Sequence, residues 1–282
     1  MKEKNIHWYP GHMKRAQNEI VEKIKLVDVI IEVLDARAPF SSRNEFFKSL
    51  GTNKPHLILL NKSDLAAKPE QNSFEELKIT DKDIILNISC EEKATYSKVC
   101  NAINKLAEDK NAKYIAKGMK PQAVRALIYG IPNVGKSSLI NVLAKRKAAG
   151  VRNTPGFTRG EQWIKVNENF ILLDTPGVLP SKYEDELVSL KLAVLGSMKD
   201  SIVPIHELTS YIFNYMKNVD ISTVNEFFKI DINKDTNYEE FVEKVCRSLL
   251  FLNKNNEIDV SRCEIFVLKK FQNSEIMKVY LD

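Results

Sequence analysis

One stretch of the sequence has both the residue types and the spacing needed to hold phosphate groups. Residues 130–137 have the pattern G-x-x-x-x-G-K-S, follow an apolar run at 123–129 and precede a segment, 138–143, that predicts the start of a helix. Glycines allow backbone N–H groups to close around phosphate oxygens, and the helix N-terminus adds a favourable dipole. Lys136 can reach the β- and γ-phosphates, and the Ser137 hydroxyl can ligate Mg²⁺. The strand–loop–helix context favours a nucleoside triphosphate site over a glycine-rich turn with a chance lysine.

A second motif predicts which base the nucleotide carries. Residues 61–64 form an N-K-x-D motif at the end of the apolar strand expected at 55–60. The Asp64 carboxylate can accept hydrogen bonds from the N1–H and the exocyclic amine of guanine, whereas adenine would leave buried groups unpaired. Asn61 can contact N7 of the base, and the Lys62 stem can lie over it. We therefore expect a guanine nucleotide.

The next expected strand, at 83–90, ends in a small polar pair. Ser89 and Cys90 could present backbone N–H groups to O6 of guanine. The pair is almost uninformative alone, and it gains its meaning from following the N-K-x-D strand.

The segment 145–159 predicts a loop that responds to the γ-phosphate. It is rich in Gly, Thr, Lys and Arg and has no helical or strand periodicity. Thr158 is the residue that we expect to close onto Mg²⁺ and the γ-phosphate, and Thr154 is the competing choice.

A D-T-P-G motif at 174–177 follows the strand expected at 170–173. Asp174 can hold Mg²⁺ through water, and the Gly177 N–H can sense the γ-phosphate. Many GTPases place a Gln directly after this motif to orient the attacking water. Here that position is Val178, whose side chain cannot hydrogen-bond to water, so another group must orient it.

Two histidines near the N-terminus are available for that role. His12 follows the Pro10-Gly11 turn, which could swing a side chain toward a site, whereas His7 precedes the turn. An imidazole that orients water or transfers a proton contributes roughly 10²–10⁴-fold to a rate. The alternative is that His12 packs the N-terminal arm or touches RNA.

A parallel sheet would bring these motifs to one edge, because functional groups gather at the carboxyl ends of its strands. At the end of the first expected strand, Asp35 and Arg37 could form a structural pair that holds the turn or act directly in catalysis, and both roles are open. Apolar, β-branched runs predict the strands 27–34, 55–60, 83–90, 123–129, 162–166 and 170–173. We expect helices at 14–26, 43–50 and 94–109, and a polar, basic connection at 109–121.

Strand signals thin out from about residue 181. Amphipathic patterns predict helices at 184–198, 207–216, 223–228, 238–250 and 260–271. In the first of them Leu187, Leu190, Val194 and Leu195 form an apolar stripe that we expect in the core. The predicted fold is thus an α/β domain at 1–180, a mostly parallel sheet with flanking helices and an N-terminal arm at 1–13, followed by a small all-helical domain at 181–282.

The order of the motifs along the chain is unusual. Ordinary small GTPases have the phosphate loop first and the N-K-x-D motif later, whereas here residues 61–64 and the Ser89-Cys90 pair precede residues 130–137. The same sheet can be built by joining the old chain ends and opening the chain elsewhere at the surface. The sequence therefore predicts a circularly permuted P-loop GTPase domain.

Composition and charge narrow the protein class. The 282 residues have ordinary globular composition, with 44% hydrophobic and 28% charged residues. Residues 1–180 carry 29 Lys and Arg against 20 Asp and Glu, a net charge of +9, whereas residues 181–282 carry 13 against 17, a net charge of −4. The basic first part suggests a polyanionic partner beyond the nucleotide, although a generic basic surface is equally open.

The cysteines and the apolar segments predict a cytoplasmic protein. The four cysteines form no C-x-x-C pair or zinc spacing and indicate reduced thiols. The N-terminus has no apolar core of a signal peptide, and the most apolar segment, 27–34, is too short to span a bilayer.

Together these motifs resemble the RbgA/YlqF ribosome-biogenesis GTPases over essentially the whole chain. The resemblance rests on W-Y-P-G-H-M at 8–13, D-A-R-A-P at 35–39, N-K-S-D at 61–64, G-I-P-N-V-G-K-S at 130–137, P-G-F-T at 155–158 and D-T-P-G at 174–177. Tyr9 stands where Phe is commoner in the family, and Cys90 where Ala is commoner. Neither departure removes a needed group.

The resemblance implies a GTPase that acts late in the maturation of the large ribosomal subunit, is stimulated by the precursor particle and favours potassium. Its partners would be ribosomal RNA and ribosomal proteins, with no DNA and no membrane, and we expect a monomer away from the ribosome. The resemblance also implies that His12 is catalytic and that Asn133 helps to hold K⁺, although Asn133 could instead stabilise its own loop.

Two other functions compete with an assembly factor. The +9 charge of the first part disfavours a non-ribosomal switch that recruits a protein through the helical domain. The intact Lys136, Ser137, Thr158 and Asp174 disfavour a nucleotide-binding module without turnover.

The expected catalytic residues are His12, Lys136 and Thr158. The expected metal ligands are Ser137, Thr158, Asp174 and Asn133. The expected nucleotide contacts, with GTP or GDP, are Asn61, Lys62, Ser63, Asp64, Ser89, Cys90, Pro132, Asn133, Val134, Gly135, Lys136, Ser137, Ser138, Asp174 and Gly177.

Overall fold

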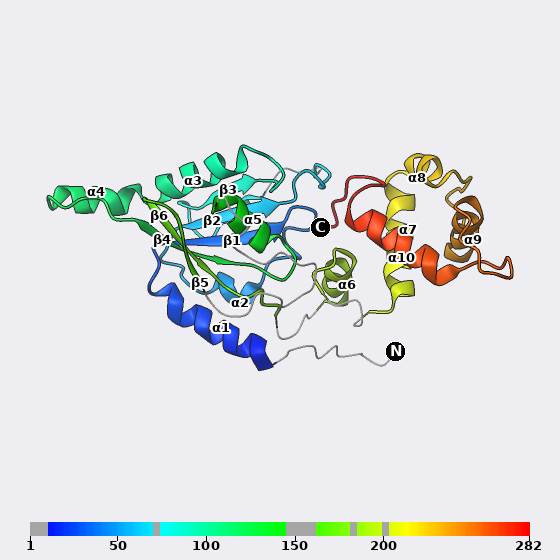
Figure 1. Cartoon of the computed structure of the whole chain (residues 1–282), viewed down its shortest axis with the longest axis horizontal. Helices are drawn as coiled ribbons and strands as arrows, with labels where there is room; N and C mark the ends of the chain where they lie inside the picture. Colours follow the sequence, from blue (N-terminus) through cyan, green and yellow to red (C-terminus); the bar gives the residue numbers. More distant parts are fainter. Residues whose placement is uncertain (1–10, 70–73, 145–161, 181–184, 199–202) are drawn as a thin grey trace. The chain divides into compact units, whose positions relative to one another are not determined.

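The computed structural model describes residues 11–69, 74–144, 162–180, 185–198 and 203–282, without the side chains of residues 11–13, 16 and 162. The chain forms two compact units (Figure 1). The first comprises residues up to Asp185 together with Tyr280–Asp282, and the second comprises Glu186–Val279. The sequence division at 180/181 had assigned the last three residues to the helical domain, whereas in the structure they lie on the first unit.

The first unit is built on a six-stranded sheet with the strand order β3-β2-β1-β4-β6-β5. Neighbouring strands run parallel except β5, which is antiparallel to β6. The predicted mostly parallel α/β sheet is therefore confirmed. The strands are β1 (Val29–Asp35), β2 (His56–Asn61), β3 (Ile84–Asn87), β4 (Val124–Tyr129), β5 (Gln162–Asn167) and β6 (Phe170–Asp174).

Helices cover both faces of this sheet. In Figure 1, α3 lies on one side of it and α1 and α2 lie on the other. The helices of the first unit are α1 (Gly11–Ile24), α2 (Glu45–Lys48), α3 (Thr95–Leu106), α4 (Glu108–Ala116) and α5 (Lys136–Leu143), with a 3₁₀ turn at Glu75–Leu77.

The central strand β1 shows why these residues form a covered parallel sheet. All seven of its residues are buried, as expected for a nearly continuous β-branched run in a sheet packed on both faces. Inside this run lies the charged Glu32, which forms a buried ion pair with Arg43 at 2.8 Å between Oε2 and Nη2. Burial raises the pKa of Glu32, and the Arg43 charge opposes that rise. The pair satisfies a carboxylate that would otherwise be costly inside the sheet.

The stretch 109–121, predicted as a connection, is largely helical. The helix α4 covers Glu108–Ala116 and has no buried residue. A helix without a buried face has no apolar stripe, so the periodicity of the sequence gave no sign of it.

The second unit is all-helical in its described part, as the sequence predicted. Its core contains stacked Phe213 and Phe241, whose ring centroids are 4.6 Å apart, and Phe228, which meets Phe241 edge-on. Side-chain caps fix three helix starts, at Asp220, Asn237 and Asp259. The helices are α6 (Glu186–Val194), α7 (Ile205–Val219), α8 (Ile221–Phe228), α9 (Tyr238–Ser248) and α10 (Val260–Gln272).

The apolar stripe predicted for the first of these helices is wrong at one end. Leu187 is 46% exposed, whereas Ser189, Leu192 and Ala193 are buried with Val194. The helix α6 has only nine residues and ends at Val194, so its buried face is set by tertiary packing and not by a long periodic stripe.

Candidate nucleotide site

Four parallel strands deliver the predicted motifs to one edge of the sheet. The register pairs Asp35 with Asn61 at the ends of β1 and β2, and it pairs Ile128 of β4 with Asp174 of β6. The loops that follow β1, β2, β4 and β6 therefore start side by side. This alignment is what brings residues 61–64, 130–137 and 174–177 together.

Glycines are required in the phosphate loop by its close contacts. A Cβ at Gly135, where φ is +97°, would lie 2.2 Å from Nδ2 of Asn61. A Cβ at Gly130 would lie 2.4 Å from the backbone oxygen of Val33. Asn133 also has a positive φ, of 60°, and α5 begins directly after Gly135. The loop is a tight, left-handed bend that ends on the N-terminus of a helix, as a phosphate cradle requires.

Lys136 is held over its own loop. Its side chain is nearly buried, and Nζ donates hydrogen bonds of 2.9 Å to the backbone oxygens of Gly130 and Ile131. Burial lowers the pKa of Lys136, and the opposing attraction comes from Asp174. The same burial raises the pKa of Asp174, and the charge of Lys136 opposes that rise. A cation beside Asp174 and an anion beside Lys136 would each relieve part of this burial cost.

The D-T-P-G segment lies against the phosphate loop. A Cβ at Gly177 would be 3.0 Å from Nζ of Lys136 and 3.0 Å from Pro132. The Val178 N–H donates to the backbone oxygen of Gly130 at 3.4 Å, and the Val178 oxygen accepts from Nδ2 of Asn44 at 2.9 Å. The Val178 side chain is only 1% exposed. It therefore points into the core, where it cannot orient a water molecule.

Asn61 joins the base-binding loop to the phosphate loop. Its Nδ2 donates to the backbone oxygen of Val134 at 2.8 Å, and its Oδ1 accepts from the Cys90 thiol at 3.4 Å. Burial raises the pKa of Cys90 to about 11, so this thiol is neutral. The sequence predicted a contact of Asn61 with the base. The structure shows that the same side chain also holds two other motifs in place.

Lys62 and Asp35 form the second connection at this edge. The Lys62 amine, from a residue with φ of 63°, lies 2.9 Å from Oδ2 of Asp35. Arg37 donates to both Asp35 oxygens at 2.8 Å, and both side chains are buried. Burial alone would raise the pKa of Asp35, but the charges of Arg37 and Lys62 hold it well below its usual range. Of the two open roles for Asp35 and Arg37, the structure shows the structural pair.

The remaining base-loop residues lie nearby with their backbone fixed. The Ser63 N–H donates to the oxygen of Ile88 at 3.1 Å, and Asp64 is exposed at the end of this loop. Ser89 is buried, and its backbone oxygen accepts from the Thr95 hydroxyl at 2.5 Å. These contacts connect the ends of β2 and β3 and hold the Ser89-Cys90 backbone beside the N-K-x-D loop.

Some predicted residues lie outside the described part of the chain. Thr158 and its competitor Thr154 are among them, and so is His7. His12 is the second residue of α1, but its side chain is not described. Their roles stay predictions.

Mg²⁺ would be compatible with the residues present at this edge. Among the residues that the structure describes, no cluster of three or more His, Cys, Asp or Glu could form an all-protein metal site. Mg²⁺ is normally held by one or two side chains together with substrate phosphates. Ser137 is the second residue of α5, and the buried Asp174 ends β6 near Lys136, which suits that kind of site.

Two connecting residues were missed in the sequence. Asn44 caps α2 through a bond from the Phe46 N–H at 3.1 Å and also reaches Val178. An Asn directly before a short helical stretch is a capping signal that could have been noticed. Its bond to Val178, 134 residues away, depends on the fold and has no local signal. The second residue is Thr95, whose hydroxyl bonds to the oxygen of Ser89 six residues earlier.

Comparison with known proteins decides the family. A Bacillus cereus protein named ribosome biogenesis GTPase A is 37% identical over 97% of this chain and 92% of that protein. A Bacillus licheniformis protein of the same name is 43% identical over 75% of each chain. The chain belongs to the ribosome biogenesis GTPase A family. The resemblance found in the sequence is thereby confirmed.

The fold comparison agrees with membership of this GTPase family. The solved structure of GNP-bound YlqF from T. maritima aligns with a TM-score of 0.63 at 24% identity, covering 95% of this chain and 97% of that one. GDP-bound YlqF aligns with a TM-score of 0.65 at 23% identity. The family described as 50S ribosome-binding GTPase matches residues 125–254, beginning at the strand before the phosphate loop. The protein is thus a circularly permuted P-loop GTPase, as predicted from the order of its motifs.

No helix within the described ranges is long and apolar enough to cross a bilayer.

Proposed function

We propose that the protein binds and hydrolyses GTP as an assembly factor for the large ribosomal subunit and acts late in its maturation. The observation that carries this proposal is the 37% identity to a ribosome biogenesis GTPase A along 97% of the chain. The net charge of +9 on residues 1–180 supports a polyanionic partner such as ribosomal RNA. The protein works in the cytoplasm and is a monomer away from the particle.

The chain supplies most of the groups that GTP needs. Backbone N–H groups of residues 133–137 surround the phosphates, and the Lys136 amine exchanges its bonds to the loop oxygens for contacts with the β- and γ-phosphates. Asp64 accepts from the guanine edge, while Asn61 and the Ser89-Cys90 backbone line it. When bound, Mg²⁺ neutralises charge that develops on the phosphate oxygens. Ser137, Asp174 and Thr158 would hold it.

Hydrolysis also needs a group that orients water. Because Val178 is buried, we assign that role to His12, which the precursor particle would bring toward the γ-phosphate. Asn133 would help to hold K⁺ beside the phosphates, where the cation adds positive charge without an arginine. Turnover that is equal in KCl and NaCl at matched ionic strength would remove the K⁺ site from this scheme.

A sucrose-gradient fractionation tests the proposed function. The protein would be mixed with large-subunit precursor particles in the presence of GTP, GDP or a non-hydrolysable GTP analogue. We expect co-migration with the particle that depends on the nucleotide. If the protein stays at the top of the gradient in every nucleotide state while it still hydrolyses GTP, a non-ribosomal switch that recruits a protein through the helical unit becomes the better account.

A further inference from the structure

The helix α4 and the turn after it form a basic projection from the first unit. Residues 110–120 contain four lysines and no acidic residue. In Figure 1, α4 extends away from the sheet, and none of its residues is buried. We call Lys110, Lys113, Lys117 and Lys120 the α4 ridge. Three of its members, all but Lys110, are exposed.

The acidic residues near the ridge lie at its base and do not neutralise the charge of its outer lysines. Glu108 and Asp109 stand in the first turn of α4, where negative charge favours the helix dipole. Asp109 pairs with Lys82 at 2.5 Å, and Asp28 pairs with Lys110 at 2.6 Å. Within the described ranges no carboxylate pairs with Lys117 or Lys120. The outer part of the ridge therefore presents uncompensated positive charge.

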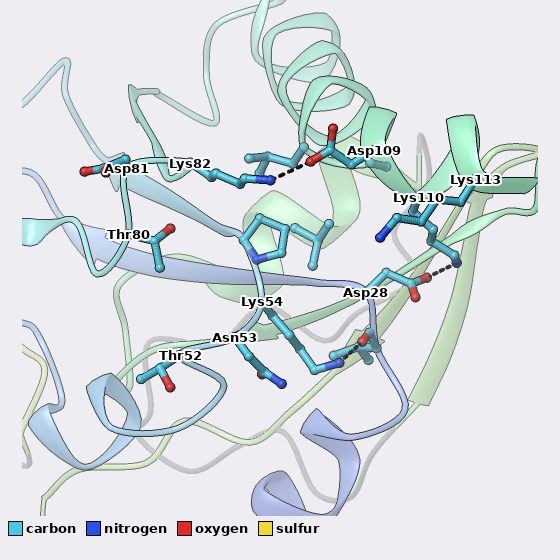
Figure 2. A pocket seen from close by; sticks show the side chains of 15 residues that line it. Asp28, Thr52, Asn53, Lys54, Thr80, Asp81, Lys82, Asp109, Lys110 and Lys113 are labelled. Atoms are coloured by element: carbon cyan, nitrogen blue, oxygen red, sulfur yellow. Dashed lines mark hydrogen bonds and ion pairs between the residues drawn. The ribbon is translucent and has the colours of Figure 1, made fainter.

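A hollow of about 680 Å³ opens at the foot of the ridge. Figure 2 shows lysines around it, from α4 and from the loops that precede β2 and β3. One of them, Lys54, is fixed by a bond of 2.6 Å from Nζ to the backbone oxygen of Val27. The charged residues that line it are Lys54, Lys82, Lys110 and Lys113, with the carboxylates Asp28, Asp81 and Asp109. Because this hollow borders the starts of β1, β2 and β3, it lies at the sheet edge opposite the nucleotide site.

The chemistry of this surface favours the backbone of a nucleic acid. Lys113, Lys117 and Lys120 form a row with no acidic residue between them, and such a row matches a chain of phosphates. Tyr114 lies under Lys110, with Nζ 5.6 Å from the ring centroid, and Ile115 is 60% exposed, so apolar surface for sugars lies between the charges. We propose that the α4 ridge and the hollow at its foot dock the sugar–phosphate backbone of a folded RNA segment. The choice of RNA rests on the proposed ribosomal function.

The α4 ridge is made of other residues than the nucleotide site. The ridge shares no residue with the phosphate loop, the N-K-x-D loop or the D-T-P-G segment. Its contribution to RNA affinity is therefore the same with GTP and with GDP, and nucleotide-dependent contacts add to it from elsewhere.

A triple charge reversal tests the proposal. The full-length variant Lys113→Glu/Lys117→Glu/Lys120→Glu leaves Lys110 and its pair with Asp28 intact. We expect its affinity for precursor particles to fall about tenfold or more, and the slope of log Kd against log salt to shrink by about 2–3, because each lysine neutralises about one phosphate. Intrinsic GTP hydrolysis and the melting temperature stay at the parental values, since none of the three side chains touches the nucleotide site or the core.

The matched control is Lys229→Glu/Lys234→Glu/Lys254→Glu, which changes net charge equally at three exposed positions of the second unit. The control should bind particles within about twofold of the parental protein. Equal losses in both variants, or an unchanged affinity and salt slope in the ridge variant, would overturn the inference. Failure of the parental protein to bind any particle would instead contradict the proposed function. Ridge-dependent binding to anionic phospholipid vesicles with RNA binding unchanged would assign the surface to a membrane and also overturn it.

Discussion

At the scale of single residues, guanine recognition depends on side chains that neighbouring motifs hold in place. Asn61 is fixed by Val134 and Cys90, and Lys62 is fixed by Asp35. Asp64, in contrast, is an exposed residue at the end of the N-K-x-D loop. This division explains why one substitution at Asp64 should change specificity without damaging the fold.

We expect Asp64→Asn to weaken GTP binding and to improve acceptance of xanthosine triphosphate. The amide inverts the donor and acceptor pattern at the edge where guanine and xanthine differ. Loss of the charge-assisted pair costs on the order of 1.5–3 kcal/mol, which is roughly a 10- to 100-fold loss of GTP affinity. Fluorescence titration with both nucleotides measures this change. A GTP affinity equal to that of the parental protein would show that Asp64 does not read the base.

A second residue-scale prediction concerns His56, the first residue of β2. Its side chain is fully buried, and neither ring nitrogen has a hydrogen-bond partner among the described residues. Burial lowers the pKa of His56, partly offset by Asp83 at 3.8 Å, and Arg43 lowers it further. The unfolded chain therefore binds a proton at His56 near pH 6.5 that the folded protein does not bind.

The free energy of unfolding should consequently fall as the pH is lowered from about 7 to 5. One extra proton in the unfolded state gives at most about 1.4 kcal/mol per pH unit. Urea unfolding of the parental protein and of His56→Leu across this range isolates the effect, because other titrating groups such as Asp174 contribute equally to both. The variant should lose less stability than the parental protein. Parallel pH profiles would contradict this account of His56.

At the residue scale, the sequence supports a prediction only where the signal is local. The phosphate loop and the N-K-x-D motif are contiguous, and their residue types follow from ligand chemistry. The partners that hold them are far away in sequence, as Asn61 is from Val134 and Asn44 is from Val178. No spacing rule predicts such pairs, because they depend on which strands become neighbours.

At the scale of elements, the short helix α2 connects the loop after β1 to the D-T-P-G segment. The Asn44 side chain caps α2 with its oxygen and holds the backbone of Val178 with its nitrogen. The residue thus couples the start of one element to the position of another. A substitution that replaces only the side-chain nitrogen can therefore remove the bond to Val178 while the cap of α2 stays.

We expect Asn44→Asp to keep the cap and to lose the bond to Val178, whereas Asn44→Ala loses both. Loss of a cap costs about 0.5–2 kcal/mol, and a buried backbone oxygen left without a donor costs about 1–3 kcal/mol. Both variants should thus be less stable than the parental protein in urea unfolding, Asn44→Asp also because its buried carboxylate would face the Val178 oxygen. Both should change GTP hydrolysis through the freed Val178 backbone. Parental hydrolysis rates in both variants would show that this contact does not position the D-T-P-G segment.

Elements were predicted well where an apolar run in the sequence marks the buried residues and poorly where no such run exists. The strands β1 and β2 are buried at every residue and stand out as apolar runs. The helix α4 has no buried residue, and α6 buries Ser189 while exposing Leu187. In both helices the surroundings decide which residues are buried, and the sequence does not contain those surroundings.

At the scale of the whole molecule, the permuted order of motifs makes the helical unit follow the D-T-P-G segment along the chain. The D-T-P-G segment leads into the second unit, which begins at Glu186, and the chain returns to the first unit at Tyr280. There the Leu281 N–H donates to the backbone oxygen of Arg37 at 2.7 Å, and Asp282 accepts from the Phe40 and Ser41 N–H groups at 2.7 and 3.1 Å. The last residues of the chain thus contact the loop that follows β1.

The residue that orients the attacking water must come from outside the D-T-P-G segment. With Val178 buried, the first unit has no water-orienting side chain directly after D-T-P-G, and the assigned residue, His12, stands near the N-terminus at the start of α1. A residue from another part of the chain can be brought in by a partner, so the defect of His12→Ala should be conditional. We expect normal binding of GTP and of precursor particles, but a loss of roughly 10²–10⁴-fold in particle-stimulated phosphate release.

His7→Ala is the control, because His7 precedes the Pro10-Gly11 turn and should leave stimulation intact. Phosphate release measured with and without particles decides between them: full stimulation of His12→Ala, or an equal loss in His7→Ala, would mean that the water is oriented by another group.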